Sequence, residues 1–295
     1  MKTIKNSLLV LLVATTSMLL INASSSVNEK ENTERPEPVV SLDFCGEKVP
    51  MNIADVHERF DREITINRNL HASTELIIKR ANRMFPVMEP ILKKYGIPDD
   101  FKYLAVIESK LENAVSPAGA RGVWQFMPAT AKEYAMEVND LVDERYHLEK
   151  STEAACKYLL DAKQRFGSWT LAAASYNGGM AGINRQIERQ KITTNYYDLL
   201  LTEETSRYVF RILALKEIMQ NPEKYGYNIP VNELYQPIAT KTIEVNTGIE
   251  NLADWANEQG INYKILKIHN PWLRDISLKN TSGKTYKIEI PIEGY

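Results

Sequence analysis

Residues 106–131 read VIESKLENAVSPAGARGVWQFMPATA, and the carboxylate of Glu108 closes a stretch that otherwise has the pattern of a buried helix. On a helix through "PDDFKYLAVIES", Phe101, Leu104 and Glu108 follow the spacing i, i+3 and i+7. Residues at this spacing share one stripe of a helix. Glu108 is therefore predicted to point towards the core, or towards a cleft that the core lines.

A carboxyl group in such a position has a chemical use. Burial without a cation disfavours the charged form and raises the pKa of the acid. A carboxyl that stays protonated near neutral pH can act as a general acid. Periodicity alone leaves open the alternative that Glu108 is a helix-end residue whose side chain reaches solvent or an arginine.

A second acid to accompany Glu108 is not evident. Most glycosidases use two carboxylates that flank the bond. Glu112 follows after the helix is expected to end, and Asp140 and Asp143, near Arg145, have the pattern of cap or surface charges. A lone acid suffices where the substrate supplies its own nucleophile, as in the substrate-assisted cleavage of N-acetylated sugars.

The composition is that of an ordinary globular protein. The chain has 295 residues, 44% hydrophobic and 25% charged, with a formal net charge of −2. No basic stripe is present, so nucleic acid is not an expected partner. The four histidines are scattered and no Cys/His cluster has metal-ligand spacing, so neither a metal nor another cofactor is expected. Cys45 and Cys156 are expected to be unpaired thiols.

The first part of the chain differs from the rest. Residues 1–23 carry two lysines, a short apolar run and a small residue at Ala23, which is the pattern of a signal peptide. No cysteine lies at the cleavage point, so a lipid anchor is not expected. Residues 24–50 are rich in Ser, Asn, Glu and Pro and are interpreted as a solvated linker.

From residue 51 to about 230 the hydrophobic rhythm is helical, and after about 235 it changes. The expected helices cover 73–85, 98–109, 128–135, 151–166, 168–177 and 203–220. The first is expected to end near Pro86, and Gly167 to stop the fourth. Strand-like alternation in 240–246 and 284–292 encloses two short helical patterns. The predicted fold is mainly α, a helical domain over 51–230 followed by a small β-α-α-β domain over 235–295.

Three motifs occur in order along the helical part: "ESKLENAVSPAGARGVWQFMPATA", "SYNGG" and "EETSRYVFRILAL". Together they resemble the family 1 lytic transglycosylases, which belong to the soluble-lytic-transglycosylase or goose-type lysozyme superfamily. The resemblance covers roughly residues 55–228 and implies a lysozyme-like helical catalytic domain. The chain departs from the usual "YNAG" by an additional glycine, which removes no reacting group.

The resemblance also implies roles for individual residues. Glu108 matches the catalytic acid/base, and Tyr176 matches a tyrosine that hydrogen-bonds the catalytic carboxylate. The remaining matches are to positions that line the cleft, bind sugar or close on the glutamate: Ser116, Gln125, Met127, Asn177 and Tyr208. From the residues alone, each of these side chains could equally serve packing, capping or backbone hydrogen bonding. Trp124 to Met127 are further expected to form a wall for sugar rings.

The implied activity is cleavage of the β-1,4 bond between N-acetylmuramic acid and N-acetylglucosamine in peptidoglycan, with a 1,6-anhydro end as the product. The implied partner is therefore the peptidoglycan glycan strand, in the periplasm or at the cell envelope, with a monomer expected and peripheral envelope association left open. Two alternatives stay open as well. One is a goose-type lysozyme that hydrolyses with water, and the other is a non-catalytic peptidoglycan-binding protein.

The C-terminal unit resembles a LysM module. The strand, the "NLADWANEQGI" helix, the "LKIHNP" segment and the closing "IEIP" strand fall in the LysM order. The usual Gly-Asp-Thr-Leu start is replaced by "GIENL", so the match is partial. The sequence leaves open whether this unit grips N-acetylglucosamine chains or packs on the catalytic domain as a structural appendage.

Overall fold

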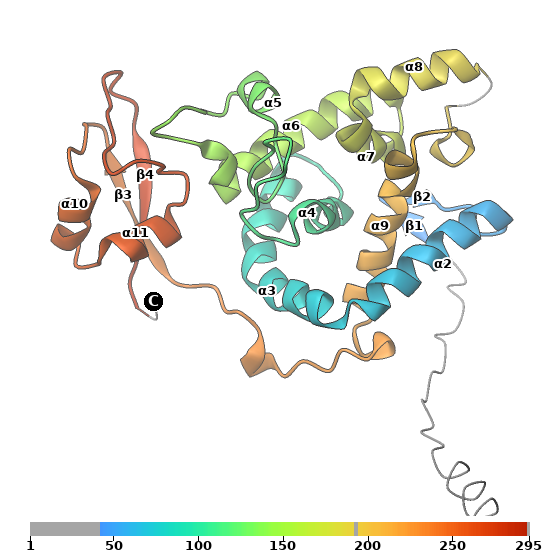
Figure 1. Ribbon diagram of the computed structural model, residues 1–295, viewed down its shortest axis with the longest axis horizontal. Helices are drawn as coiled ribbons and strands as arrows, with labels where there is room; N and C mark the ends of the chain where they lie inside the picture. The colour runs from blue at the N-terminus through green and yellow to red at the C-terminus, as the bar shows by residue number, and fades with distance from the viewer. Residues whose placement is uncertain (1–41, 192–193, 294–295) are drawn as a thin grey trace, which may run out of the picture. The chain divides into compact units, whose positions relative to one another are not determined.

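The computed structural model describes residues 42–191 and 194–293, and these form a mainly helical protein with two small antiparallel sheets (Figure 1). The predicted fold class is confirmed. The predicted signal peptide lies outside the described residues. No helix among the described residues is long and apolar enough to cross a membrane.

A short hairpin begins the described chain, where the sequence predicts a linker. Strands β1 (Asp43–Phe44) and β2 (Glu47–Lys48) pair antiparallel. The side chain of Phe44 is fully buried and packs edge-on against Phe101, with ring centroids 5.3 Å apart. Residues 42–50 are therefore part of the fold. The composition of 24–50, averaged over the whole segment, conceals the apolar residues near its end.

Helices α2 (Ala54–Asn69) and α3 (His71–Lys94) follow. The prediction that the α3 helix ends near Pro86 is wrong, because α3 continues through Pro86 and Pro90. Both prolines are exposed and lie one turn apart, so the backbone bonds they remove are on the solvent side. On the opposite side Met88 and Leu92 are fully buried, and their packing holds the helix together.

The helix that carries Glu108 is short and sharply ended. A 3₁₀ turn η1 (Asp99–Phe101) starts after Pro98 and leads into α4 (Lys102–Ser109). Lys110 and Leu111 then adopt left-handed backbone angles, with φ of 56° and 58°, so the chain leaves the helix directly after Ser109. Glu112 is therefore not one turn further along the same helix.

The helical domain continues after α4 with further helices and 3₁₀ turns. These are α5 (Pro128–Glu133), η2 (Glu144–Tyr146), α6 (Leu148–Phe166), α7 (Trp169–Gly178), α8 (Met180–Gln190), η3 (Tyr196–Asp198), α9 (Glu203–Gln220), η4 (Glu223–Tyr225) and η5 (Val231–Glu233). Pro128 opens α5 and Gly167 ends α6 with φ of 69°, as the sequence predicts. Helices α2 and α8 were not among the predicted helices. Helix α9 contacts α2, α4 and α7, and nearly all its apolar side chains are buried, which makes it the central helix of the domain.

The C-terminal unit has the predicted β-α-α-β order. Strands β3 (Thr240–Val245) and β4 (Tyr286–Pro291) pair antiparallel, and α10 (Leu252–Glu258) and α11 (Tyr263–His269) lie between them in sequence. The side chains of Asn251 and Asn262 cap the two helices.

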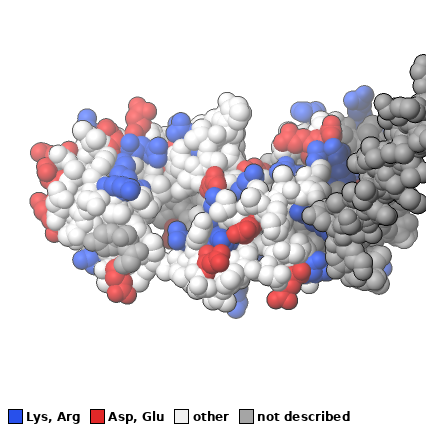
Figure 2. Space-filling model, turned by 60° about the horizontal axis from the view of Figure 1, so that its bottom comes forward, with Lys and Arg blue, Asp and Glu red and all other residues white. Residues whose placement is uncertain are grey.

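In the view of Figure 2, Lys and Arg side chains are interspersed with Asp and Glu on the described surface.

Neither cysteine is in a disulfide, as predicted, and Cys156 is buried within α6. Among residues 42–191 and 194–293, no group of three or more His, Cys, Asp or Glu side chains could hold a metal ion.

The hairpin also caps a helix of the helical domain. The carboxylate of Glu47 accepts hydrogen bonds from the backbone amides of Trp169 (2.6 Å) and Thr170 (2.9 Å) at the start of α7. Ser168 and Thr170 add their hydroxyl groups. Although burial opposes ionisation, these bonds lower the pKa of Glu47 to about 2. Glu47 therefore stabilises the fold in its charged form.

We expect Glu47→Gln to lower the free energy of unfolding at pH 7 by about 1–2 kcal/mol, the usual value of a charged helix cap. Because the pKa is depressed in the folded state, the contribution is complete above the unfolded value of 4.5 and is lost as the pH falls towards about 2. Urea denaturation across this range should show the wild type and the variant converging at low pH. Glu58→Gln, an exposed position on α2, is the matched control, and an equal loss in both variants would contradict the capping role.

Candidate active site

Glu108 lies in the last turn of α4, on the predicted apolar stripe. Phe101, Leu104 and Ala105 on the same stripe are fully buried, and Glu108 itself is largely buried. Burial raises its pKa to about 7, against the opposing effects of a hydrogen bond from Tyr208 and the positive charge of Arg211. Glu108 is therefore not a solvated helix-end residue, and burial favours the protonated form of its carboxyl group well above the pH at which an exposed glutamate ionises.

Tyr208 is the hydrogen-bond partner of this carboxyl group. It lies on α9, which packs against α4, and its side chain is 1% exposed. Its hydroxyl group donates to Oε1 of Glu108. Burial and the nearby Glu108 charge raise the pKa of Tyr208 well above its usual value, so the phenol stays a neutral donor. The position predicted to close on the glutamate does so in the structure.

Tyr176 differs from its predicted role. Its hydroxyl group donates to the carbonyl oxygen of Trp124 at 2.8 Å, and its ring packs edge-on against Phe126 and Tyr158. A phenol has one proton, so this bond excludes simultaneous donation to Glu108. Burial and the charge of Glu108 raise the pKa of Tyr176, which places it within electrostatic range of the carboxyl group. The predicted hydrogen bond is made by Tyr208 instead.

Asn177 joins the end of α7 to the start of α9. Its Nδ2 donates to Glu204 at 3.0 Å, and its Oδ1 accepts from the hydroxyl of Thr205 at 2.8 Å. The charge of Glu204 contributes to the raised pKa of Glu108, so a second carboxylate acts on this site. Glu204 was not predicted as a site residue because, at the start of a helix, an acidic residue is expected simply from the helix dipole.

Residues 114–127, here called the cleft loop, carry three of the predicted sugar-binding side chains. Ser116 accepts a hydrogen bond from the amide of Ala120 at 3.0 Å and closes a turn within the loop. The side-chain amide of Gln125 donates to the carbonyls of Ala114 (3.1 Å) and Gly122 (2.8 Å). Ser116 and Gln125 therefore shape the loop from within.

The expected wall of side chains from Trp124 to Met127 is only partly formed. Trp124 is fully buried, its indole nitrogen donates to Thr152 at 2.9 Å, and Phe126 is also buried. Met127 is 42% exposed and Val115 is 56% exposed. The loop thus presents these two apolar side chains, whereas its aromatic rings fill the core beneath.

An ion pair buried under the loop was also missed. Asp143 was expected to be a cap or surface charge. Its side chain and that of Arg145 are each about 3% exposed and form a bidentate pair at 2.8 and 2.7 Å. Asp143 does cap η2, but its main partner is the guanidinium group. Nη1 of Arg145 donates to the carbonyls of Gly119 (3.1 Å) and Phe126 (3.2 Å) at the two ends of the loop's turn. Sequence spacing cannot reveal this role, because the acceptors are backbone atoms some 20 residues away.

A cavity of about 600 Å³ adjoins the site. It is bounded by α2, α3, α4 and α9, and includes Ile107 next to Glu108, together with Glu204 and Arg211. Glu112, the nearest acid in sequence, instead pairs with Arg80 and is half exposed. Glu108 and Tyr208 do not themselves line this cavity, whereas Glu204 and Arg211, whose charges act on Glu108, do. A largely buried acid with a tyrosine donor and a nearby arginine is an arrangement suited to proton transfer.

Two parts of the chain match known families. Residues 87–198 match the family described as the transglycosylase SLT domain. Residues 241–294 match the soluble lytic transglycosylase C-terminal LysM-like domain.

Similarity to individual proteins extends further along the chain. Membrane-bound lytic murein transglycosylase D of Escherichia coli strain K12 is 27% identical over 248 residues, which cover 82% of this chain and 54% of that protein. The protein of the same name from E. coli O6:H1 gives the same values. A putative tributyltin chloride resistance protein of Alteromonas sp. strain M-1 is 29% identical over 136 residues, covering 44% of this chain and 66% of the relative. The chain spans about half the length of the E. coli relatives that it matches.

A substitution at Gly122 would test how closely the cleft loop packs against the segment that contains Arg145. A Cβ at Gly122 would lie 1.8 Å from the carbonyl oxygen of Arg145, whereas one at Gly119 would meet nothing within 4 Å. Both glycines have positive φ, 81° and 90°, so backbone strain affects both variants. We expect Gly122→Ala to cost at least about 3 kcal/mol of unfolding free energy, and Gly119→Ala about 1–2 kcal/mol. Similar losses by urea denaturation would contradict the close contact.

Proposed function

Because the chain carries a transglycosylase SLT domain and a LysM-like domain, and is homologous to membrane-bound lytic murein transglycosylase D, we propose that it is a peptidoglycan lytic transglycosylase. The observation that carries this proposal is the Glu108 carboxyl group, whose pKa is raised to about 7 beside a tyrosine donor. Such a group can give a proton and take one back in a single catalytic cycle.

In the first step, protonated Glu108 donates its proton to the glycosidic oxygen of the β-1,4 bond between N-acetylmuramic acid and N-acetylglucosamine. The bond to C1 of the muramic acid breaks as the oxygen leaves. The N-acetyl oxygen of the same sugar supports the positive charge that develops at C1, so no second protein carboxylate has to attack. Tyr208 and Arg211 stabilise the carboxylate that Glu108 becomes.

In the second step, the Glu108 carboxylate removes the proton from the C6 hydroxyl of the muramic acid. The C6 oxygen then bonds to C1 and yields the 1,6-anhydro end. Glu108 regains its proton, and no water is consumed. The other predicted residues act around this centre. Met127 contacts sugar rings, Ser116 and Gln125 fix the loop, Tyr176 ties α7 to the loop, and Asn177 holds Glu204.

Hydrolysis is the second candidate, and the position of Glu204 favours it. A lysozyme reaction needs a base or an acceptor that orients a water molecule. Glu204 influences Glu108 electrostatically and lines the adjoining cavity, so it could serve in this way. The two reactions differ in product, because the anhydro end is lighter by one water than the hydrolysed end.

The substrate sets where the protein acts. We propose that it works at the cell envelope, where peptidoglycan lies, after export directed by residues 1–23. The helical domain over 51–230 is the catalytic part and 235–295 the LysM-like part, and the protein acts as a monomer.

We expect Glu108→Gln to lower the release of muropeptides from purified sacculi by about 10²–10⁴-fold, the usual contribution of general acid–base catalysis. Glu112→Gln, four residues away and half exposed, is the matched control and should stay within about twofold of the wild type. Mass spectrometry of the wild-type products should find 1,6-anhydro ends. Hydrolysed ends would favour the lysozyme reaction, and equal release by wild type and Glu108→Gln would exclude Glu108 as the acid.

The pH dependence tests the same group. Because Glu108 must begin the cycle protonated, kcat/KM should fall as the pH rises above about 7. Tyr208→Phe removes a donor that favours the carboxylate, so the falling limb should move to higher pH. The variant should also lower kcat by roughly tenfold or more, since a hydrogen bond to a charged group is worth about 1.5–3 kcal/mol. A limb that stays in place or moves to lower pH would contradict the contact.

A further inference from the structure

The segment between α5 and α6, residues 137–147, has two sides, and we call it the brace. One side supports the cleft loop. Arg145 donates to two loop carbonyls, and its own carbonyl oxygen touches Gly122. The loop in turn reaches the helix of Glu108, because the hydroxyl of Ser109 donates to the carbonyl of Val123 at 2.8 Å. The position of the brace therefore fixes the position of the loop.

The other side of the brace is part of the LysM-like core. Val142 and Tyr146 are buried in the same apolar cluster as Trp272, Leu273 and Tyr286. A β-bridge pairs Val142 with Leu273. The backbone adds hydrogen bonds from Asp143 to Trp272 (2.9 Å) and from Arg274 to Leu141 (2.8 Å). The two units are thus not joined by the connection over 230–240 alone.

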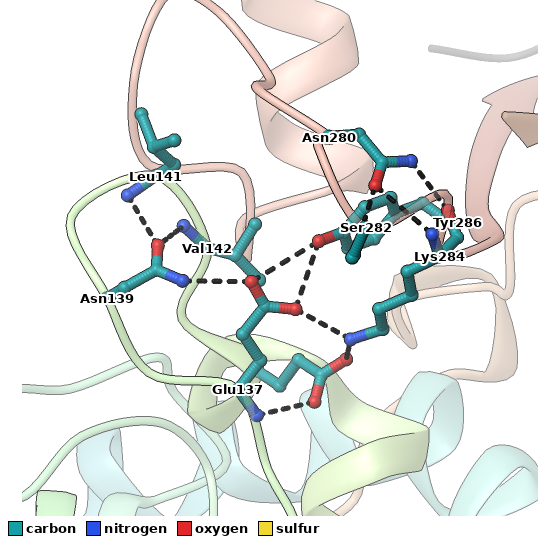
Figure 3. A network of polar contacts seen from close by, with 9 residues as sticks. Glu137, Asn139, Leu141, Val142, Asn280, Ser282, Lys284 and Tyr286 are labelled. Atoms are coloured by element: carbon teal, nitrogen blue, oxygen red, sulfur yellow. Dashed lines mark hydrogen bonds and ion pairs between the residues drawn. The ribbon is translucent and has the colours of Figure 1, made fainter. Parts of the chain in front are cut away.

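Polar contacts complete this junction (Figure 3). The ammonium group of Lys284 lies 2.6 Å from one carboxylate oxygen of Glu137 and 3.0 Å from Glu144. The hydroxyl of Tyr286 donates to the carboxylate of Glu137 at 3.0 Å, and Glu144 accepts from the amide of Glu137 at 2.7 Å. Glu144 directly precedes Arg145 in the chain. Lys284 of the LysM-like unit therefore pairs with the neighbour of Arg145, whose guanidinium group bonds the loop.

We infer that the LysM-like unit positions the cleft loop, with Lys284 and Tyr286 as positioning residues that act through Glu137, Glu144 and Arg145. The inference rests on the proposed function in so far as the loop binds glycan. A module that only gripped glycan at the end of a tether would leave the loop unchanged when its contacts with the brace were weakened. Here, loss of Lys284 leaves two carboxylates close together without their cation, and their repulsion loosens the brace.

The test compares three variants of the full chain. Lys284→Met removes the cation, and Lys284→Arg retains a charge that can bond both carboxylates. Lys287→Met is the matched control, because Lys287 lies three residues further on, in β4, has a side chain that is 68% exposed and makes only a 3.8 Å contact with Glu244. Hydrogen–deuterium exchange would follow the amides of Arg121, Gly122 and Phe126, which are hydrogen-bonded within the loop.

We expect exchange at these amides to rise roughly three- to tenfold in Lys284→Met and to stay at the wild-type rate in Lys287→Met and Lys284→Arg. With a soluble glycan strand, KM should rise by a similar factor while kcat changes little. The reason is that Glu108 and Tyr208 lie on α4 and α9, and the brace is not part of either helix. General destabilisation would lower the active fraction and hence kcat instead.

Unchanged loop exchange in Lys284→Met, with the LysM-like unit still folded, would overturn the inference. So would an equal rise in Lys287→Met. The exchange measurement needs no turnover. If wild-type protein released nothing from sacculi, the proposed function would fail, while the positioning of the loop would still be decided.

Discussion

The burial of one ionisable group, Glu108, is the constraint on which the rest of the helical domain depends. A carboxyl group on an apolar stripe can be kept only if its polar atoms find partners, and Tyr208 provides one. This contact requires α9 to pass directly against α4, and α9 is accordingly buried along most of its length. The abrupt end of α4, through two residues with left-handed backbone angles, means that no further turn of this helix follows the carboxyl group.

The cleft loop is an irregular segment that is held in one conformation by its polar contacts. Its polar backbone groups bond to each other, to the side chains of Ser116 and Gln125, and to Arg145. The guanidinium group can be buried there because Asp143 pairs with it through two hydrogen bonds and the loop carbonyls take further N–H groups. Buried ion pairs of this kind add little net stability compared with apolar packing, but losing one partner is costly. The pair therefore specifies the loop shape more than it strengthens the fold.

The parts of this structure that the sequence predicts are those governed by local rules. Hydrophobic periodicity placed Glu108 on a buried stripe, Gly167 marked a helix end, and alternation found β3 and β4. The errors share a cause. Pro86 stays within a helix, Phe44 is core, and Arg145 supports a loop because of contacts with residues far away in sequence, which local patterns do not contain. The same holds for the two tyrosines, since only the packing of α7 and α9 decides that Tyr208 and not Tyr176 donates to the carboxyl group.

The contact between the C-terminal unit and the brace is also explained by the burial of apolar surface. A β-α-α-β unit of this size has a small core of its own, and it completes this core with Val142 and Tyr146 from the helical domain. Sharing a core in this way ties the stability of the small unit to the shape of the brace. The dependence is mutual, because without the small unit those two side chains would face water and Glu137 and Glu144 would lack Lys284. A separate module on a flexible tether would need neither contact, so this junction is better explained by a need to hold the brace, and with it the cleft loop, in one position.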